Sequence, residues 1–256
     1  MKKVMLSCAL LISAVVASAI PWSADAYRHS ASLIRAGKLT EARAYLDTIE
    51  GVSDAVPIFR AWADHVDTSV DTSTPAKLYA VAERYYSALG RTGASLKNSS
   101  EYVVLWIYVR GKEYESALTY YNTLENPNYS RVALAIYALQ KLGRADEAIA
   151  LAVAHKSWYV AFNAVNTKKD KVKTFEYGKE LLLSSYQKAP VVTTVLNAIG
   201  NYDYTDTAIT KEMQIDFLKA VDVKYRRFMA TDEVTWKPIL AGVLYTLKSL
   251  GVEVVE

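Results

Sequence analysis

Residues 141–152 read KLGRADEAIALA, and two earlier stretches, RAGKLTEARAYL at 35–46 and RGKEYESALTYY at 110–121, repeat the same pattern. Each stretch combines the end of one helix, a tight turn at or near a glycine, an acidic first turn and a second helix with a small alanine. The pattern predicts helix–turn–helix hairpins, which stack because one hairpin cannot bury its own apolar face. We therefore expect an all-α fold in which degenerate helix-turn-helix repeats stack as a short α-solenoid, with an irregular helical bundle as the alternative.

The rest of the chain also favours helices, because it contains no sustained alternation of polar and apolar residues. The breaks carry recognisable signals. Residues 67–75, DTSVDTSTP, form a polar loop that offers Ser73 or Thr74 as a helix cap and places Pro75 in a first turn. Further breaks are expected at 90–93, 126–128, 168–171 and 200–206. Together these signals predict about a dozen helices.

The hairpins resemble the tetratricopeptide repeat, a helix pair of about 34 residues with a small residue early in its second helix. Residues 117 and 148, both alanine, are 31 positions apart, and Lys112 occupies the turn position that Gly143 occupies in the third stretch. The resemblance covers about 27–50 and 99–156, and residues 247–251, LKSLG, echo 139–143, LQKLG. It implies a concave surface, formed by the first helix of each hairpin, on which ligands bind.

The first nineteen residues have the pattern of a secretory signal peptide. Lys2 and Lys3 precede a mostly apolar run at 4–16, which is too short to span a bilayer, and residues 17–19, ASA, form a cleavage site. A lipid attached at Cys8 is the alternative to cleavage. We expect a signal peptide at 1–19, a single helical domain at 20–256, a periplasmic or secreted location and no membrane insertion after cleavage.

Removal of this leader changes what the composition implies. The chain has a formal net charge of +3, and loss of Lys2 and Lys3 lowers it to +1. A nucleic-acid partner then loses its electrostatic support. Cys8 is the only cysteine, so the mature chain has no disulfide, no thiolate metal site and no cysteine nucleophile.

No motif for catalysis, a metal or a cofactor stands out, so we expect none of the three. His29, His65 and His155 lie far apart and lack the spacing of metal ligands. The alternative is an envelope enzyme that acts on cell-wall glycan, which would need two carboxylates facing a cleft. Acids adjacent to tyrosines occur at Glu101, Glu176 and Asp203, although helix caps and solvated faces explain them more simply.

The abundance of tyrosine favours a binding function instead. The chain has 19 tyrosines and five phenylalanines, and tyrosine is typical of interfaces because its ring packs while its hydroxyl contacts water. The resemblance places a small set of aromatic and basic side chains on the concave surface: Tyr102, Trp106, Arg110, Tyr137 and Lys141. Corresponding positions in the first hairpin include Tyr27 and Arg35. An aromatic floor with a basic edge suits a peptide with acidic groups or a terminal carboxylate. In the alternative, the aromatic rings pack between helices and the basic residues only favour helix C-termini.

The combined expectation is an exported protein–protein interaction scaffold that binds a peptide or protein partner on a helical-repeat surface. Two other hypotheses remain from the sequence. One is the cell-wall glycan enzyme, and the other is a purely structural role in self-assembly. A continuous aromatic and basic groove favours the scaffold, whereas a closed cleft with two facing carboxylates favours the enzyme.

Overall fold

The structure is a computed structural model that describes residues 20–21, 23–50, 53–184, 187–200, 202–205 and 207–254. The expected signal peptide at 1–19 lies outside these residues. The chain divides into two compact units, one ending at Gly111 and the other starting at Lys112. Each is described by itself below, and the expectation of one domain over 20–256 stays a prediction.

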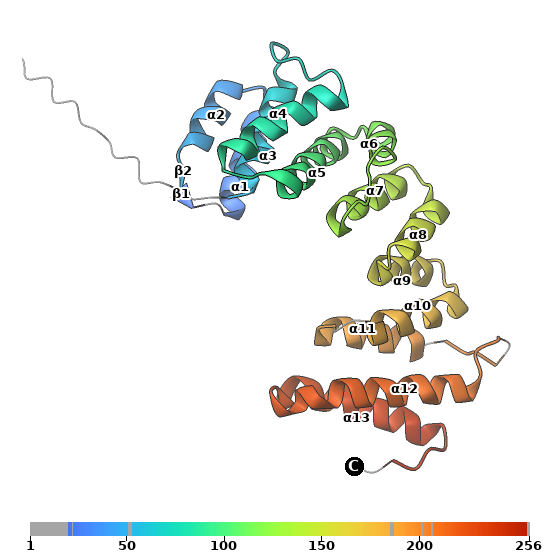
Figure 1. Ribbon diagram of the computed structural model, residues 1–256. Helices are drawn as coiled ribbons and strands as arrows, with labels where there is room; N and C mark the ends of the chain where they lie inside the picture. The colour runs from blue at the N-terminus through green and yellow to red at the C-terminus, as the bar shows by residue number, and fades with distance from the viewer. Residues whose placement is uncertain are drawn as a thin grey trace, which may run out of the picture. The chain divides into compact units, whose positions relative to one another are not determined.

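Unit 1 consists of five helices and one very short strand pair in its described part (Figure 1). The elements are β1 (Ile20–Pro21), α1 (Ala24–Arg35), α2 (Leu39–Asp47), β2 (Ile49–Glu50), α3 (Ala55–Val66), α4 (Pro75–Ala88) and α5 (Gly93–Gly111). The two strands pair in parallel over two residues each. Each helix packs against the next, and α3 also contacts α1 and α5.

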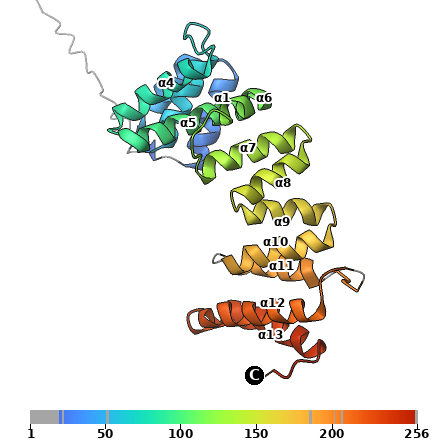
Figure 2. The same cartoon turned by 45° about the vertical axis from the view of Figure 1, so that its right-hand side comes forward.

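Unit 2 is helical throughout its described part, and its helices follow one another in layers (Figure 2). The elements are α6 (Tyr114–Tyr121), α7 (Tyr129–Lys141), α8 (Ala145–Ala154), α9 (Trp158–Thr167), α10 (Lys171–Ser184), α11 (Ala189–Gly200), α12 (Lys211–Arg226), a 3-10 turn η1 (Arg227–Ala230) and α13 (Glu233–Ser249). Neighbouring helices pack in series here as well from α6 to α11, after which α12 packs on α10 and on α13, and α11 contacts α13. The all-α, solenoid-like fold expected from the sequence is therefore confirmed.

The turns of the three similar stretches share one backbone conformation. Gly37, Lys112 and Gly143 have φ angles of 70°, 64° and 74°. The first and third stretches share a hydrogen bond just after the first helix. The amide of Lys38 donates to Leu33 O, and the amide of Arg144 donates to Leu139 O, both at 2.9 Å. This is the Schellman ending of a helix, which requires a left-handed residue. Lys112 thus occupies the position of a glycine, as the alignment predicted.

Local capping signals also place helix boundaries. Thr74 caps α4, since its hydroxyl accepts from the amide of Lys77 and Pro75 takes the first helical position. Asn128 caps α7 in the same way through the amide of Arg131. Both boundaries lie where the sequence predicted breaks.

A buried carboxylate joins three helices of unit 1. Asp64 of α3 accepts hydrogen bonds from Arg43 of α2 at 2.8 Å, from Arg84 of α4 at 2.8 Å and from the Tyr85 hydroxyl at 2.6 Å. Its residue surface is 4% exposed. Because its charge is met by two guanidinium groups and a hydroxyl, burial is compensated. Asp64 therefore fixes the packing of α2, α3 and α4.

Unit 2 has a continuous apolar core that includes Phe162, Phe175, Phe217, Tyr225 and Trp236. Gly178 of α10 lies at a close helix contact in this core. A Cβ atom there would lie 2.9 Å from both Ile199 Cδ1 and Val195 Cγ1 of α11. The glycine lets α10 and α11 approach closely.

Candidate functional site: arginines on tryptophans in unit 1

Helix α5 carries three of the residues that the sequence assigned to a binding surface. Tyr102, Trp106 and Arg110 are spaced four apart and therefore lie along one face of the helix. Arg110 stands in the last turn, where the helix dipole favours a cation. Tyr102 is half-buried, and this burial raises the pKa of its hydroxyl.

Trp106 lies in the core and not on an open floor. Its residue surface is 9% exposed. Its ring centroid is 5.7 Å from that of Phe59 and 5.5 Å from that of Trp62, both on α3. Such spacings are typical of favourable aromatic packing. The ring of Trp106 therefore packs between helices, as the alternative to an exposed binding surface predicted.

Arg110 lies exposed above this aromatic cluster. Its guanidinium carbon is 5.2 Å from the Trp106 ring centroid and 5.5 Å from that of Tyr27 on α1, and it donates a hydrogen bond to the Tyr27 hydroxyl. The Tyr27 ring in turn contacts Phe59 at 5.2 Å. Cation–π contacts on two rings and one hydrogen bond thus hold the guanidinium in place.

A second arginine lies on the neighbouring tryptophan. Arg35, in the last turn of α1, has its guanidinium carbon 5.7 Å from the Trp62 ring centroid. It is exposed, like Arg110. We call Arg35, Arg110, Trp62, Trp106 and Tyr27 the arginine–tryptophan site.

The charge balance distinguishes these two arginines from the others in unit 1. The unit contains seven arginines. Five of them form ion pairs with aspartates: Arg28, Arg43, Arg60, Arg84 and Arg91. Arg35 and Arg110 pair with no carboxylate among the described residues. The two guanidiniums without a counter-charge are the two on the tryptophans.

This arrangement suits recognition of an anion. A guanidinium presents a planar fork of N–H donors that matches a carboxylate or a phosphate. The edges of both groups can still donate, since their faces rest on rings. The site therefore offers two positive donor groups, each held over a largely buried tryptophan ring.

The two sequence-assigned residues of unit 2 form a separate, exposed contact. Tyr137 of α7 is 43% exposed, and the ammonium of Lys141 lies 5.2 Å from its ring centroid. The ring of Tyr114 on α6 meets Tyr137 edge to face at 6.4 Å. We call Tyr114, Tyr137 and Lys141 the tyrosine–lysine patch, and the role of Tyr137 and Lys141 in binding stays a prediction.

The other polar residues named from the sequence have structural surroundings. Each histidine contacts a neighbour: His29 the ring of Tyr45, His65 the hydroxyl of Thr72 at 3.0 Å and His155 the hydroxyl of Tyr121 at 3.3 Å. Of the acids considered for glycan hydrolysis, Glu101 is buried, whereas Glu176 and Asp203 are exposed. Among the described residues, no three side chains of the metal-binding types come together as a candidate metal site.

Helix α3 contributes two rings to the aromatic cluster and was not predicted from the sequence to be part of a site. Phe59 and Trp62 lie in residues 55–66, outside the three similar stretches. A signal was present, because the two rings are spaced three residues apart and therefore face the same side of a helix. The spacing does not predict that this helix packs beside α5.

In the described part of the chain, no helix is both long and apolar enough to cross a membrane. We compared the chain with models of protein families, with curated proteins and with solved structures, and none of the three comparisons gave a match.

Proposed function

We propose that this protein is an exported scaffold that binds acidic peptide segments of a partner protein, with the arginine–tryptophan site as a principal contact. The observation that carries the proposal is the pair of exposed guanidiniums, Arg35 and Arg110, which stand on tryptophans and lack a carboxylate partner among the described residues. An acidic side chain or a terminal carboxylate of the partner would supply the missing counter-charge.

The neighbouring rings add a reason to expect a peptide. Trp62 and Trp106 are largely buried yet lie directly beneath charged groups. Interfaces commonly combine arginine and aromatic anchors, because the ring desolvates the contact while the guanidinium gives it direction. Here the rings hold the guanidiniums in place, so an acidic group of a peptide would meet donors that are already positioned.

The tyrosine–lysine patch supports the same kind of ligand in unit 2. Lys141 forms no ion pair with a described carboxylate, and Tyr137 remains accessible beside it. We assign it as a second contact of similar chemistry. Export to the periplasm or the exterior follows from the proposed signal peptide at 1–19, and the tetratricopeptide-like repeat remains part of the proposal through the shared turns at Gly37, Lys112 and Gly143.

An array of twelve-residue peptides tests the proposal. The peptides differ in their number of glutamates and in whether the C-terminus is free or amidated, and each is titrated against the purified mature protein. We expect binding that rises with acidic content and falls at high salt. The double variant Arg35→Gln/Arg110→Gln should lose this binding.

The matched control is Arg28→Gln, which removes an exposed arginine from α1 whose charge is already met by Asp25. Trp106→Ala is a poor test, because it removes a core ring and would disturb folding. Equal binding of neutral and acidic peptides, or unchanged binding by the double variant, would contradict the proposal.

A further inference from the structure

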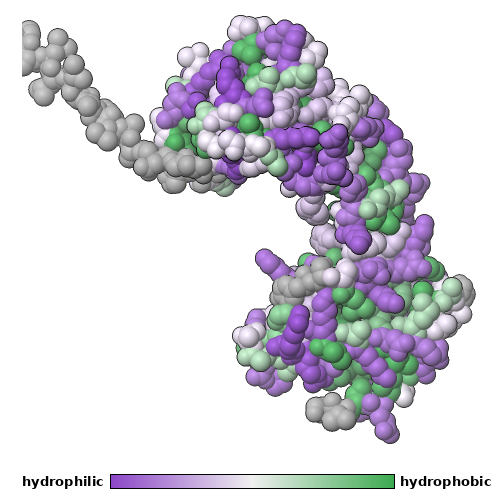
Figure 3. All heavy atoms as spheres, in the orientation of Figure 1, coloured by the Kyte–Doolittle hydropathy of each residue, from purple (hydrophilic) through white to green (hydrophobic). Residues whose placement is uncertain are grey.

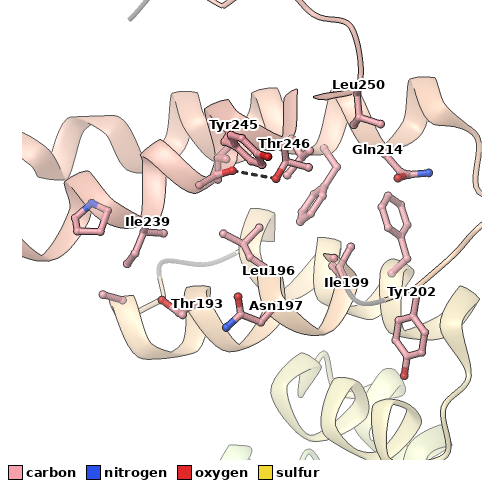
Figure 4. Close-up of a pocket in the computed structure, with 18 of the residues that line it drawn as sticks. Thr193, Leu196, Asn197, Ile199, Tyr202, Gln214, Ile239, Tyr245, Thr246 and Leu250 are labelled. Carbon is pink, nitrogen blue, oxygen red and sulfur yellow. Dashed lines mark hydrogen bonds between the residues drawn. The ribbon is translucent and has the colours of Figure 1, made fainter. Parts of the chain in front are cut away.

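A large cleft lies between α11 and α13 of unit 2, and residues of α12 also line it (Figure 4). Its volume is about 1010 Å³. The walls are mainly aliphatic, from residues such as Leu196, Ile199, Ile239 and Leu250. A mostly apolar concave site with a few polar groups is the usual form of a small-molecule site.

The lining of this cleft contains no charged side chain among the described residues. Burying an unpaired charge in such surroundings is costly, so the cleft disfavours an ionised ligand. This sets it apart from the arginine–tryptophan site of unit 1, whose donors are cationic.

Two neutral amide side chains nonetheless border the cleft. Asn197 of α11 and Gln214 of α12 line it, and their side-chain amides form no hydrogen bond with another described residue. Each amide offers both donors and an acceptor. They would suit a hydroxyl or ester group of an uncharged ligand.

Helix α13 has two residues of low helix propensity on the side that lines the cleft. Pro238 and Gly242, four residues apart, are the two residue types that least favour a helix interior, and both line the cleft. A Cβ atom at Gly242 would meet nothing within 4 Å. No contact inside the described protein therefore explains this glycine, whereas a ligand that approaches the backbone closely would.

The cleft is elongated along its two walls. Its α11 lining runs from Ala189 to Gly200, the full length of that helix, which corresponds to about 16 Å. Figure 3 shows hydrophobic residues at the surface of the C-terminal part of unit 2, and Val223, Val234 and Tyr245 are each more than 70% exposed. An extended apolar chain fits this space better than a compact ring system does.

We propose that this cleft binds a neutral amphiphile, that is, an uncharged lipid-like molecule with an extended hydrocarbon chain and a hydroxyl or ester head. The chain would lie between α11 and α13, against Gly242, and the head would bond to one of the two amides, Asn197 or Gln214. This site is independent of the peptide-binding function proposed above, since it shares no residue with the arginine–tryptophan site or the tyrosine–lysine patch.

Isothermal titration of the mature protein with 1-decanoylglycerol, below its aggregation concentration, tests the assignment. We expect saturable one-to-one binding. Decanoate, which has the same chain with a charged head, should bind at least tenfold more weakly.

Two leucine variants locate the site. Gly242→Leu fills the cleft and should weaken binding at least tenfold, while the space around this position and the better helix propensity of leucine keep the protein folded. Ala241→Leu is the matched control, because Ala241 is exposed on the same helix and does not line the cleft.

Three outcomes would overturn the proposal: no saturable binding, equal affinity of the Gly242→Leu and Ala241→Leu variants, or decanoate binding as tightly as the glyceride. A monomer–dimer equilibrium that Gly242→Leu alone abolishes would also overturn it, because the cleft would then be a contact between copies of the chain. None of these results bears on Arg35 or Arg110, so the peptide proposal is judged separately.

Discussion

The guanidinium of Arg110 lies 5.2 Å from the ring of Trp106, and that of Arg35 lies 5.7 Å from the ring of Trp62. The two indoles are in contact, with centroids 5.5 Å apart. Two cations that would otherwise repel each other are thus held over one aromatic surface. Neither cation has a carboxylate partner among the described residues, so both can accept the negative charge of a ligand.

Asp64 should contribute strongly to the stability of unit 1. Asp64→Ala would leave Arg43, Arg84 and the Tyr85 hydroxyl without their shared acceptor. We expect a loss of about 2 kcal/mol in urea unfolding, which is below the cost of breaking a fully buried pair because both guanidiniums are partly exposed. The control Asp47→Ala removes only the exposed pair with Arg60 and should cost less than about 0.5 kcal/mol. Equal losses would refute the assigned role.

The two helix-interior glycines of unit 2 should respond oppositely to alanine. Gly178→Ala forces a Cβ to within 2.9 Å of Ile199 and Val195, and overpacking of this kind costs about 1–3 kcal/mol. Gly242→Ala meets open space and should stabilise by about 0.5–1 kcal/mol through helix propensity. Thermal unfolding of both variants checks the pair. Destabilisation by Gly242→Ala would mean that α13 packs differently.

Replacement of Lys112 by glycine should make the folded protein more stable. Its φ of 64° is left-handed, a conformation that strains a side chain but not glycine. We expect Lys112→Gly to stabilise by up to about 1 kcal/mol, whereas Gly143→Ala, at the equivalent turn, should destabilise by a similar amount. The melting temperatures of the two variants measure this, and shifts in the same direction would argue against the shared turn geometry.

The loop between α3 and α4 should open in acid. Hydrogen bonds from Ser69 and Arg43 lower the pKa of Asp67 to about 2, and Lys77 and Ser73 lower the pKa of Asp71 to about 2. A carboxyl with a depressed folded-state pKa stabilises the fold above its unfolded pKa, near 3.8, and that contribution disappears as the pH falls through 2.

Carbon-detected NMR titration of the two carboxyls measures these values directly. Hydrogen exchange of the loop should speed up between pH 4 and pH 2 in the wild type, relative to a distant segment, and this acceleration should be smaller in Asp67→Asn. Midpoints near 3.8 for both carboxyls would show that the loop hydrogen bonds do not form in solution.

Local features of the fold could be predicted from the sequence because they are encoded by adjacent residues. The Thr74 cap, the first-turn Pro75 and the turns at Gly37, Lys112 and Gly143 each follow from a few neighbouring positions. The spacing of Tyr102, Trp106 and Arg110 likewise identified one face of a helix.

What covers that face could not be predicted, since it depends on helices distant in sequence. Trp106 is buried because α3 brings Phe59 and Trp62 against it, and no local pattern specifies that contact. The same holds for the charges. Asp54 and Asp64 neutralise Arg91 and Arg84 only after α3 and α4 pack. That Arg35 and Arg110 have no carboxylate partner in the described part of the chain is therefore visible only in the structure.

The most direct test of the account is the affinity of the mature protein for a glutamate-rich twelve-residue peptide, measured by fluorescence anisotropy for the wild type, Arg28→Gln and Arg35→Gln/Arg110→Gln. We predict that the wild type and Arg28→Gln bind alike and that the double variant binds at least tenfold more weakly, with a smaller dependence on salt. Equal affinity of the double variant and the wild type would contradict the claim that these two arginines form the binding site.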